Sequence, residues 1–176
     1  MRYLLPLAVL LALPMAAHAQ TADAPAEDEV VIEGIGLSQN IPCEGRDIGI
    51  YGSGNKIDLT GTCGNVVVHG DSHQVSIEKA KALTLSGADH TVSAASIADL
   101  SVQTTGHVVT ATLDGNGAPA KVQVNGAEQT LNLTLASETS IDIAGTDQVV
   151  NWSLADGVAE PKIEIGGIDN AVNRIP

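Results

Sequence analysis

Aromatic side chains are scarce in this chain of 176 residues, which has no phenylalanine, two tyrosines and one tryptophan. Beyond the N-terminal apolar segment only Tyr51 and Trp152 remain. A hydrophobic core must therefore be built from valine, isoleucine and leucine, and the first two favour β-strands. Two aromatic residues so far apart cannot form the platform on which polysaccharide-cleaving β-helices usually hold sugar rings.

Positive charge is also scarce, because 8 lysines and arginines face 21 acidic residues and the formal net charge is −13. Binding to nucleic acid depends on neutralising phosphates with such cations, so we exclude nucleic acid as a partner. The chain has no Gly-x-Ser-x-Gly elbow, no His-Glu-x-x-His motif and no phosphate loop. We therefore expect no enzymatic activity and no cofactor.

Only one stretch is long and apolar, and it lies at the N-terminus. Arg2, the apolar run from Leu4 to Met15 and the site Ala17-His18-Ala19 predict a signal peptide over residues 1–19; the alternative is a retained N-terminal anchor helix. No later run approaches the roughly 18 apolar residues of a membrane span. We expect a periplasmic or secreted protein in which residues 20–29 form a flexible acidic leader and residues 30–47 an N-terminal cap.

The rest of the chain, residues 48–176, repeats one pattern seven times. With position zero at Ile48, Val66, Leu83, Leu100, Val122, Ile141 and Ile163, the spacings are 18, 17, 17, 22, 19 and 22. Positions two and nine are always aliphatic, and position four is glycine in every unit except at Thr104. Position seven is always an amide or an imidazole: Asn55, His73, His90, His107, Gln129, Gln148 and Asn170.

Apolar residues alternate with polar ones on both sides of the glycine, so each unit predicts strand, tight turn, strand. A β-solenoid and a meander of hairpins both fit this pattern. In a solenoid, equivalent positions stack about 4.8 Å apart, and side chains at position seven can bond along a ladder, as stacked asparagine and glutamine do in cross-β assemblies. In a meander they cannot touch. We therefore predict an all-β, single-domain parallel β-solenoid of about seven coils, in which the position-seven residues form an internal structural ladder.

The two cysteines, Cys43 and Cys63, fall at nearly the same place on adjacent coils of this frame. In an exported chain this favours a structural disulfide over a metal site or a catalytic thiol.

Three segments carry a family resemblance: CEGRDIGIYGSGNKIDLTGTC, GADHTV and IEIGGIDNAVN. They resemble the bacterial exported family known as domain of unknown function 3060 (DUF3060), over about residues 41–173. The resemblance implies an envelope or secreted location and a solenoid-like β fold, and it implies no catalytic residues. Several asparagines of the family pattern are histidine or glutamine here.

Two groups of residues could bind a divalent metal. His73, His90 and His107 share position seven in consecutive coils and could bind zinc or copper if their rings faced solvent. Position seven has the parity of the apolar positions, which favours inward-facing rings. Glu128, Asp147 and Asp169 share position six, in segments that resemble half of a calcium-binding nonapeptide; plain acidic turns are the alternative.

The outward positions eight and ten carry short polar side chains, with asparagines toward the C-terminus. Such a face could bind an envelope component or polysaccharide, or a second copy of the chain; an ordinary solvated sheet is the alternative. We thus carry three hypotheses: a non-enzymatic envelope, adhesion or interaction module; a divalent-metal or calcium binder; and a carbohydrate-active enzyme.

Overall fold

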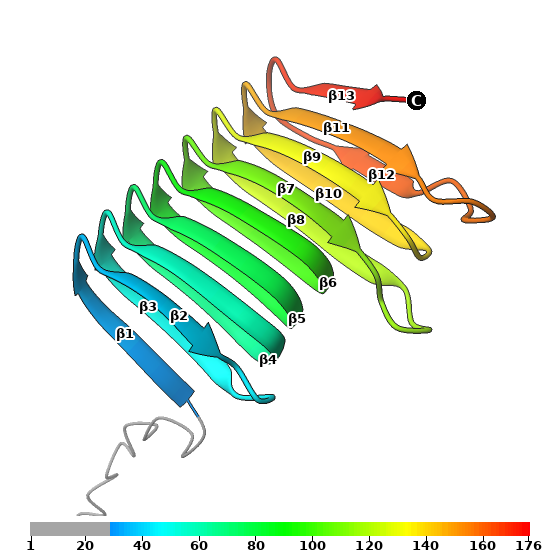
Figure 1. Ribbon diagram of the computed structural model, residues 1–176. Helices are drawn as coiled ribbons and strands as arrows, with labels where there is room; N and C mark the ends of the chain where they lie inside the picture. The colour runs from blue at the N-terminus through cyan, green and yellow to red at the C-terminus, as the bar shows by residue number, and fades with distance from the viewer. Residues whose placement is uncertain (1–28) are drawn as a thin grey trace, which may run out of the picture.

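The structure is a computed structural model in which residues 29–176 are described (Figure 1). The predicted signal peptide at 1–19 and nearly all of the predicted leader at 20–29 lie outside these residues. The described residues contain thirteen β-strands, and every pairing between them is parallel. They have no helix long and apolar enough to cross a membrane.

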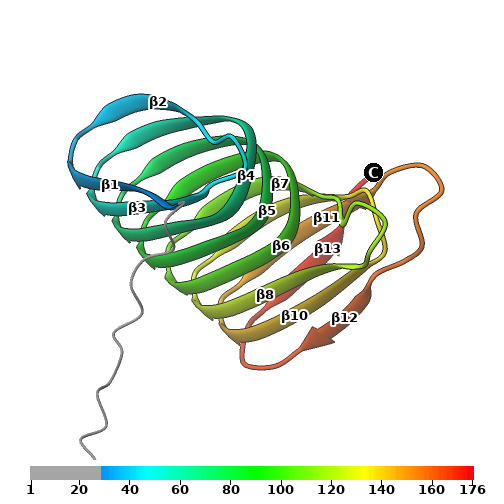
Figure 2. The ribbon, with the colours of Figure 1, turned by 90° about the horizontal axis from the view of Figure 1, so that it is seen from below.

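Each coil has two long sides, which we call face A and face B (Figure 2). Face A contains β1 (Glu29–Ile35), β3 (Asp47–Ser53), β8 (Ala120–Ala127), β10 (Thr139–Thr146) and β12 (Lys162–Ile165). Face B contains β2 (Ser38–Pro42), β7 (Val108–Leu113), β9 (Thr130–Leu135), β11 (Val149–Leu154) and β13 (Ala171–Arg174). Three longer strands begin on face B and bend onto face A: β4 (Lys56–Asp71), β5 (Gln74–Ala88) and β6 (Thr91–Thr105).

The strand register follows the repeat read from the sequence. Position-zero residues pair from coil to coil, as Ile48 does with Val66 and Leu83 with Leu100. Position nine does the same on face B, where Ile57 pairs with Val75. Equivalent residues are therefore nearest neighbours, which confirms the parallel solenoid and excludes the hairpin meander.

The solenoid has about eight turns rather than seven, because residues of the predicted cap form a coil themselves. β1 pairs with β3, so that Val30 lies at position zero beside Ile48, and β2 pairs with the start of β4. In this coil position seven is Leu37 and position nine is Gln39. These two residues depart from the amide and aliphatic columns, and this is why the sequence frame does not include the coil.

The core lies between the two faces and consists of stacked aliphatic side chains. Positions zero, two, nine and eleven are fully buried through the middle coils, as in Leu83, Leu85, Leu131 and Leu133. Trp152 at position eleven stacks beside Leu133 and is 6% exposed. The guanidinium of Arg174 lies 5.5 Å from its ring centre, so the tryptophan packs at the C-terminal end of the core. Burial in the core explains Trp152 without a ligand.

Glycine at position four permits close approach between coils. Gly70 and Gly145 have φ of 129° and 126°, a region that L-residues avoid. A Cβ atom on either would lie 2.0 Å from the carbonyl oxygen of the glycine in the preceding coil. Glycine is therefore required at position four for two reasons: the turn needs a positive φ, and the preceding coil leaves no room for a Cβ atom.

Candidate functional site

The position-seven side chains form a continuous hydrogen-bonded ladder inside the turn that joins face A to face B. The first six, from Asn55 to Gln148, are fully buried, and Asn170 in the last coil is half-buried. In each rung the side chain accepts a hydrogen bond from the backbone N–H of the position-seven residue one coil earlier. The first bond runs from the Leu37 amide to Asn55 Oδ1 (2.9 Å) and the last from the Gln148 amide to Asn170 Oδ1 (3.0 Å).

The donor end of each side chain satisfies a carbonyl in the same turn. Asn55 and Asn170 use both amide hydrogens, one on the position-three carbonyl of their own coil and one on the position-four carbonyl of the coil before. Gln129 and Gln148 bond only the position-four carbonyl of the coil before. The histidines bond their own position-three carbonyl, and His107 Nε2 also lies 3.3 Å from the Thr104 hydroxyl. One acceptor and one donor at a fixed spacing are thus the common requirement, and asparagine, glutamine and neutral histidine all meet it.

The hydrogen bonds fix the protonation state of His73, His90 and His107. In all three rings Nδ1 accepts a hydrogen bond from a backbone N–H at 3.1–3.2 Å. The Nδ1 atom therefore carries no proton. Each Nε2 then donates to a carbonyl oxygen. The rings stack with centres 5.0 and 4.7 Å apart. Burial lowers the pKa of His90 to about 4 and lowers the pKa of His73 and His107 as well.

This geometry leaves no free nitrogen on the three histidines for a zinc or copper ion. A metal would have to displace a backbone hydrogen bond at each ring. Within residues 29–176 no group of three or more histidine, cysteine or acidic side chains is arranged to hold a metal ion. His69, the remaining histidine of the described chain, lies on face A and its Nδ1 is 2.9 Å from Ser86 Oγ.

The acidic residues at position six occupy a strained backbone position in the turn. Glu128, Asp147 and Asp169 have φ of 58°, 57° and 56°, and their side chains are exposed. Gly54 and Gly106 hold the same position in other coils. Asparagine, aspartate and glycine are the residues that tolerate this conformation best, so the turn itself accounts for Asp147 and Asp169.

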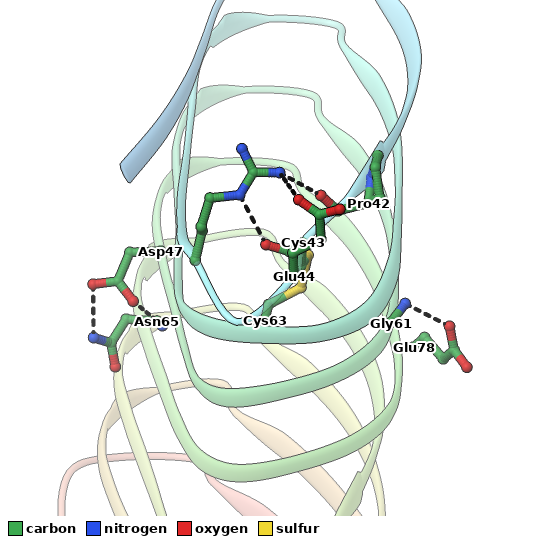
Figure 3. The surroundings of a disulfide bond; sticks show 9 residues. Pro42, Cys43, Glu44, Asp47, Gly61, Cys63, Asn65 and Glu78 are labelled. Atoms are coloured by element: carbon green, nitrogen blue, oxygen red, sulfur yellow. Dashed lines mark hydrogen bonds and ion pairs between the residues drawn. A yellow bond between two sulfur atoms is a disulfide. The ribbon is translucent and has the colours of Figure 1, made fainter. Parts of the chain in front are cut away.

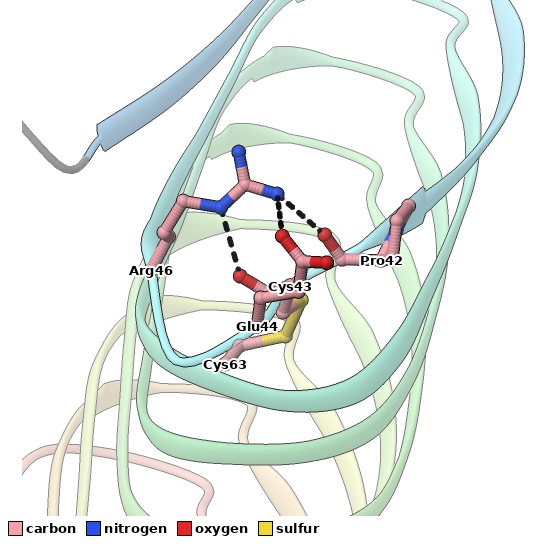
Figure 4. A network of polar contacts seen from close by, with 5 residues as sticks. All are labelled: Pro42, Cys43, Glu44, Arg46 and Cys63. Carbon is pink, nitrogen blue, oxygen red and sulfur yellow. Dashed lines mark hydrogen bonds and ion pairs between the residues drawn. A yellow bond between two sulfur atoms is a disulfide. The ribbon is translucent and has the colours of Figure 1, made fainter.

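The cysteines form the predicted disulfide, with Cα atoms 4.8 Å apart, and it joins the first coil to the second (Figure 3). Arg46 closes the end of the first coil beside it. Its Nε donates to the Cys43 carbonyl, and one terminal nitrogen contacts the Pro42 carbonyl and the Glu44 carboxylate (Figure 4). On face A, Asp47 accepts two hydrogen bonds from Asn65 one coil later. These contacts are structural and lie around the end of the core.

Face B is the regular polar surface that the sequence predicts at positions eight and ten. Its C-terminal part carries an exterior ladder: Asn173 donates to Asn151 at 3.1 Å, and Asn151 donates to Asn132 at 3.0 Å. Toward the N-terminus the face has a shallow hollow of about 200 Å³, lined mainly by polar side chains: Lys56, Asp58, Gln74, Val75, Ser76, Thr91 and Ser93. The asparagine run was visible in the sequence, whereas its bonding and the hollow were not.

The fold and its polar ladder define the chain as a parallel β-solenoid with stacked, inward-facing amides and imidazoles. Residues 50–107 match the family model described as "Protein of unknown function (DUF3060)". The match confirms the resemblance to this family that the sequence motifs predict, and it covers the ladder from Asn55 to His107. No curated protein and no solved structure matched the chain.

Proposed function

We propose that the protein is an exported, non-enzymatic interaction module of the cell envelope, with face B as its working surface. The observation that carries the proposal is the order of this face. Short hydroxyl and amide side chains repeat at the coil spacing, and neighbouring asparagines hold one another in place. A rigid array of donors and acceptors loses little entropy on binding and suits a hydroxylated polymer with its own repeat.

The surroundings of face B support binding rather than catalysis. The hollow on it contains one lysine and one aspartate among neutral side chains. A general acid and base need a partner within hydrogen-bond reach, and within residues 29–176 no ion pair joins Lys56 to Asp58. The disulfide supports an oxidising compartment outside the cytoplasm. We therefore place the protein in the periplasm or outside the cell.

The proposal is tested by sedimentation of the purified chain with isolated envelope polysaccharide and peptidoglycan. Two arginines introduced on face B, Ser76→Arg with Ser93→Arg, should abolish co-sedimentation by blocking the hollow. The control adds the same charge on face A through Asn125→Arg with Thr146→Arg, two exposed positions, and should bind like the parent. Equal loss in both variants, or retention in the first, would contradict a role for face B.

A further inference from the structure

The loop between β7 and β8, residues 114–119, interrupts the repeat at the turn that joins face B to face A. Its residues line a second hollow, which is separate from the one on face B. The loop accounts for the 22-residue spacing between Leu100 and Val122. It reaches back toward the N-terminal coils, where the side chain of Asn116 accepts a hydrogen bond from Lys79 Nζ at 3.0 Å. The hollow beneath has a volume of about 290 Å³ and is lined by Lys79, Lys81 and several alanine methyl groups.

A third hollow, of about 330 Å³, lies on face A next to the hollow lined by the loop. Asp99 lines both hollows, so they lie side by side, and we call the two together the groove. The face A part is lined by Lys121 and by the polar side chains of Thr84, Ser101 and Gln123. The groove thus combines cations at several points with hydroxyl and amide groups between them.

Three lysines line the groove, although acids outnumber cations in this chain by 21 to 8. Within residues 29–176 the ion pairs involve Arg46, Lys162 and Arg174, and none involves a lysine of the groove. Nearby acids are partly engaged elsewhere, since Glu78 accepts from the Gly61 amide and Asp114 from the Asn116 amide. Among the residues that line the groove, the three lysines are accompanied by one acid, Asp99, which the strand register places beside Lys121, so the lining carries more positive than negative charge.

We propose that this groove binds a carboxylated sugar, as a single residue or as a short acidic oligosaccharide. The lysines would pair with carboxylates and the hydroxyl and amide groups would bond the sugar hydroxyls. The net charge of −13 and the presence of Asp99 disfavour a densely charged polyanion, which would be repelled along most of its length. A sugar acid carries its charges farther apart. The site is separate from face B.

The test is titration of the purified protein with a trimer of galacturonic acid, followed by calorimetry and by amide NMR shifts. The matched ligand is the methyl ester of the same trimer, which keeps the hydroxyls and removes the charge. We expect the acid to bind, the ester to bind at least about fivefold more weakly, and the shifts to cluster at residues 98–101 and 115–123. Affinity for the acid should fall as salt is raised.

Two variants locate the interaction. Lys81→Gln with Lys121→Gln should weaken binding of the acid about fivefold to tenfold, the effect of losing two exposed ion pairs. Lys162→Gln with Arg174→Gln removes the same charge elsewhere and should leave affinity within about twofold. Lys79 is left intact because it holds the loop. Equal binding of acid and ester, equal loss in both variants, no binding of the acid, or shifts confined to face B would each overturn the proposal.

Discussion

At the scale of single residues, Thr104 is the one departure from glycine in the position-four column of the frame. Its φ is 77°, which is unfavourable for a β-branched residue. The register pairs position-four residues from Gly34 through Gly145, but Gly87 and Thr104 are not paired. The Thr104 hydroxyl instead accepts from the Gly87 amide at 2.9 Å. The strand pairing of the position-four residues is therefore interrupted between Gly87 and Thr104.

We predict that Thr104→Gly stabilises the protein by about 1 kcal/mol. Relief of the left-handed backbone contributes about 1–3 kcal/mol, and the greater freedom of glycine in the unfolded chain offsets about 0.5–1 kcal/mol of it. Urea unfolding measures the difference. The reverse change in a neighbouring coil, Gly87→Thr, should destabilise, because its Cβ would meet the Gly70 carbonyl oxygen. A Thr104→Gly variant less stable than the parent would refute the assignment of strain.

The buried histidines predict a loss of stability in mild acid. Their pKa values are lowered in the folded state, to about 4 for His90, and an unfolded histidine titrates near 6.5. The unfolded chain therefore binds more protons below pH 6.5. The stabilisation is complete above that pH and is lost as pH falls toward 4. For His90 alone the loss approaches about 3 kcal/mol.

The matched variant replaces the three histidines by glutamine, the residue of the next two rungs. It should fold, and its free energy of unfolding should fall less between pH 7 and about pH 4.5 than that of the parent. Both proteins keep the same carboxylates, so the difference between the two falls in the free energy of unfolding comes from titration of the imidazoles. An identical fall in both would show that the rings are accessible to protons in the folded chain.

At the scale of elements, the disulfide joins the first coil to the rest of the stack. It closes a loop with a sequence separation of 20 residues, which corresponds to roughly 3 kcal/mol in the chain-entropy model. We predict that Cys43→Ser with Cys63→Ser lowers stability by about this amount. Hydrogen exchange should accelerate in β1 and β2 while β8 to β10 stay protected. Uniform acceleration through the solenoid would contradict a local role for the bridge.

Much of this arrangement could be predicted from the sequence because every coil repeats the same physical requirements. Glycine at position four and the amide or imidazole at position seven are set by backbone contacts between coils, so they recur visibly. The sequence predicts a cap in place of the first coil because this coil starts the ladder. Leu37 contributes only its backbone amide to Asn55, and no earlier rung requires a polar side chain there.

The surfaces were less predictable, because nothing in the repeat constrains them. The 22-residue spacing before Val122 indicated an insertion, but not that Asn116 reaches Lys79 from 37 residues away. Likewise the pairing of Asn132, Asn151 and Asn173 depends on side-chain rotamers that the pattern does not specify. The sequence therefore predicts the polar face, whereas its hollow and the groove emerge only from the three-dimensional structure.

At the scale of the whole molecule, stability should be distributed coil by coil, since each coil packs on its neighbours and the Lys79–Asn116 hydrogen bond is an exception that reaches past one coil. Deletion of residues 74–90 removes one turn and joins position seven of one coil, His73, to position eight of the next, Thr91. We predict a folded protein with a β-rich circular dichroism spectrum and a lower melting temperature. Deletion of residues 74–81 alone disrupts the phase of the repeat and should unfold the middle coils. Equal damage from both deletions would contradict a modular stack.

The central claim is that the position-seven column is an internal ladder of neutral side chains, so that binding takes place on the outer surfaces. NMR of the imidazole nitrogens over a pH series tests it most directly. We predict that His73, His90 and His107 carry their proton on Nε2, with Nδ1 as acceptor, and that His90 begins to titrate only near pH 4. Protonated Nδ1 atoms at neutral pH, or titration of all three rings near pH 6.5, would contradict the claim.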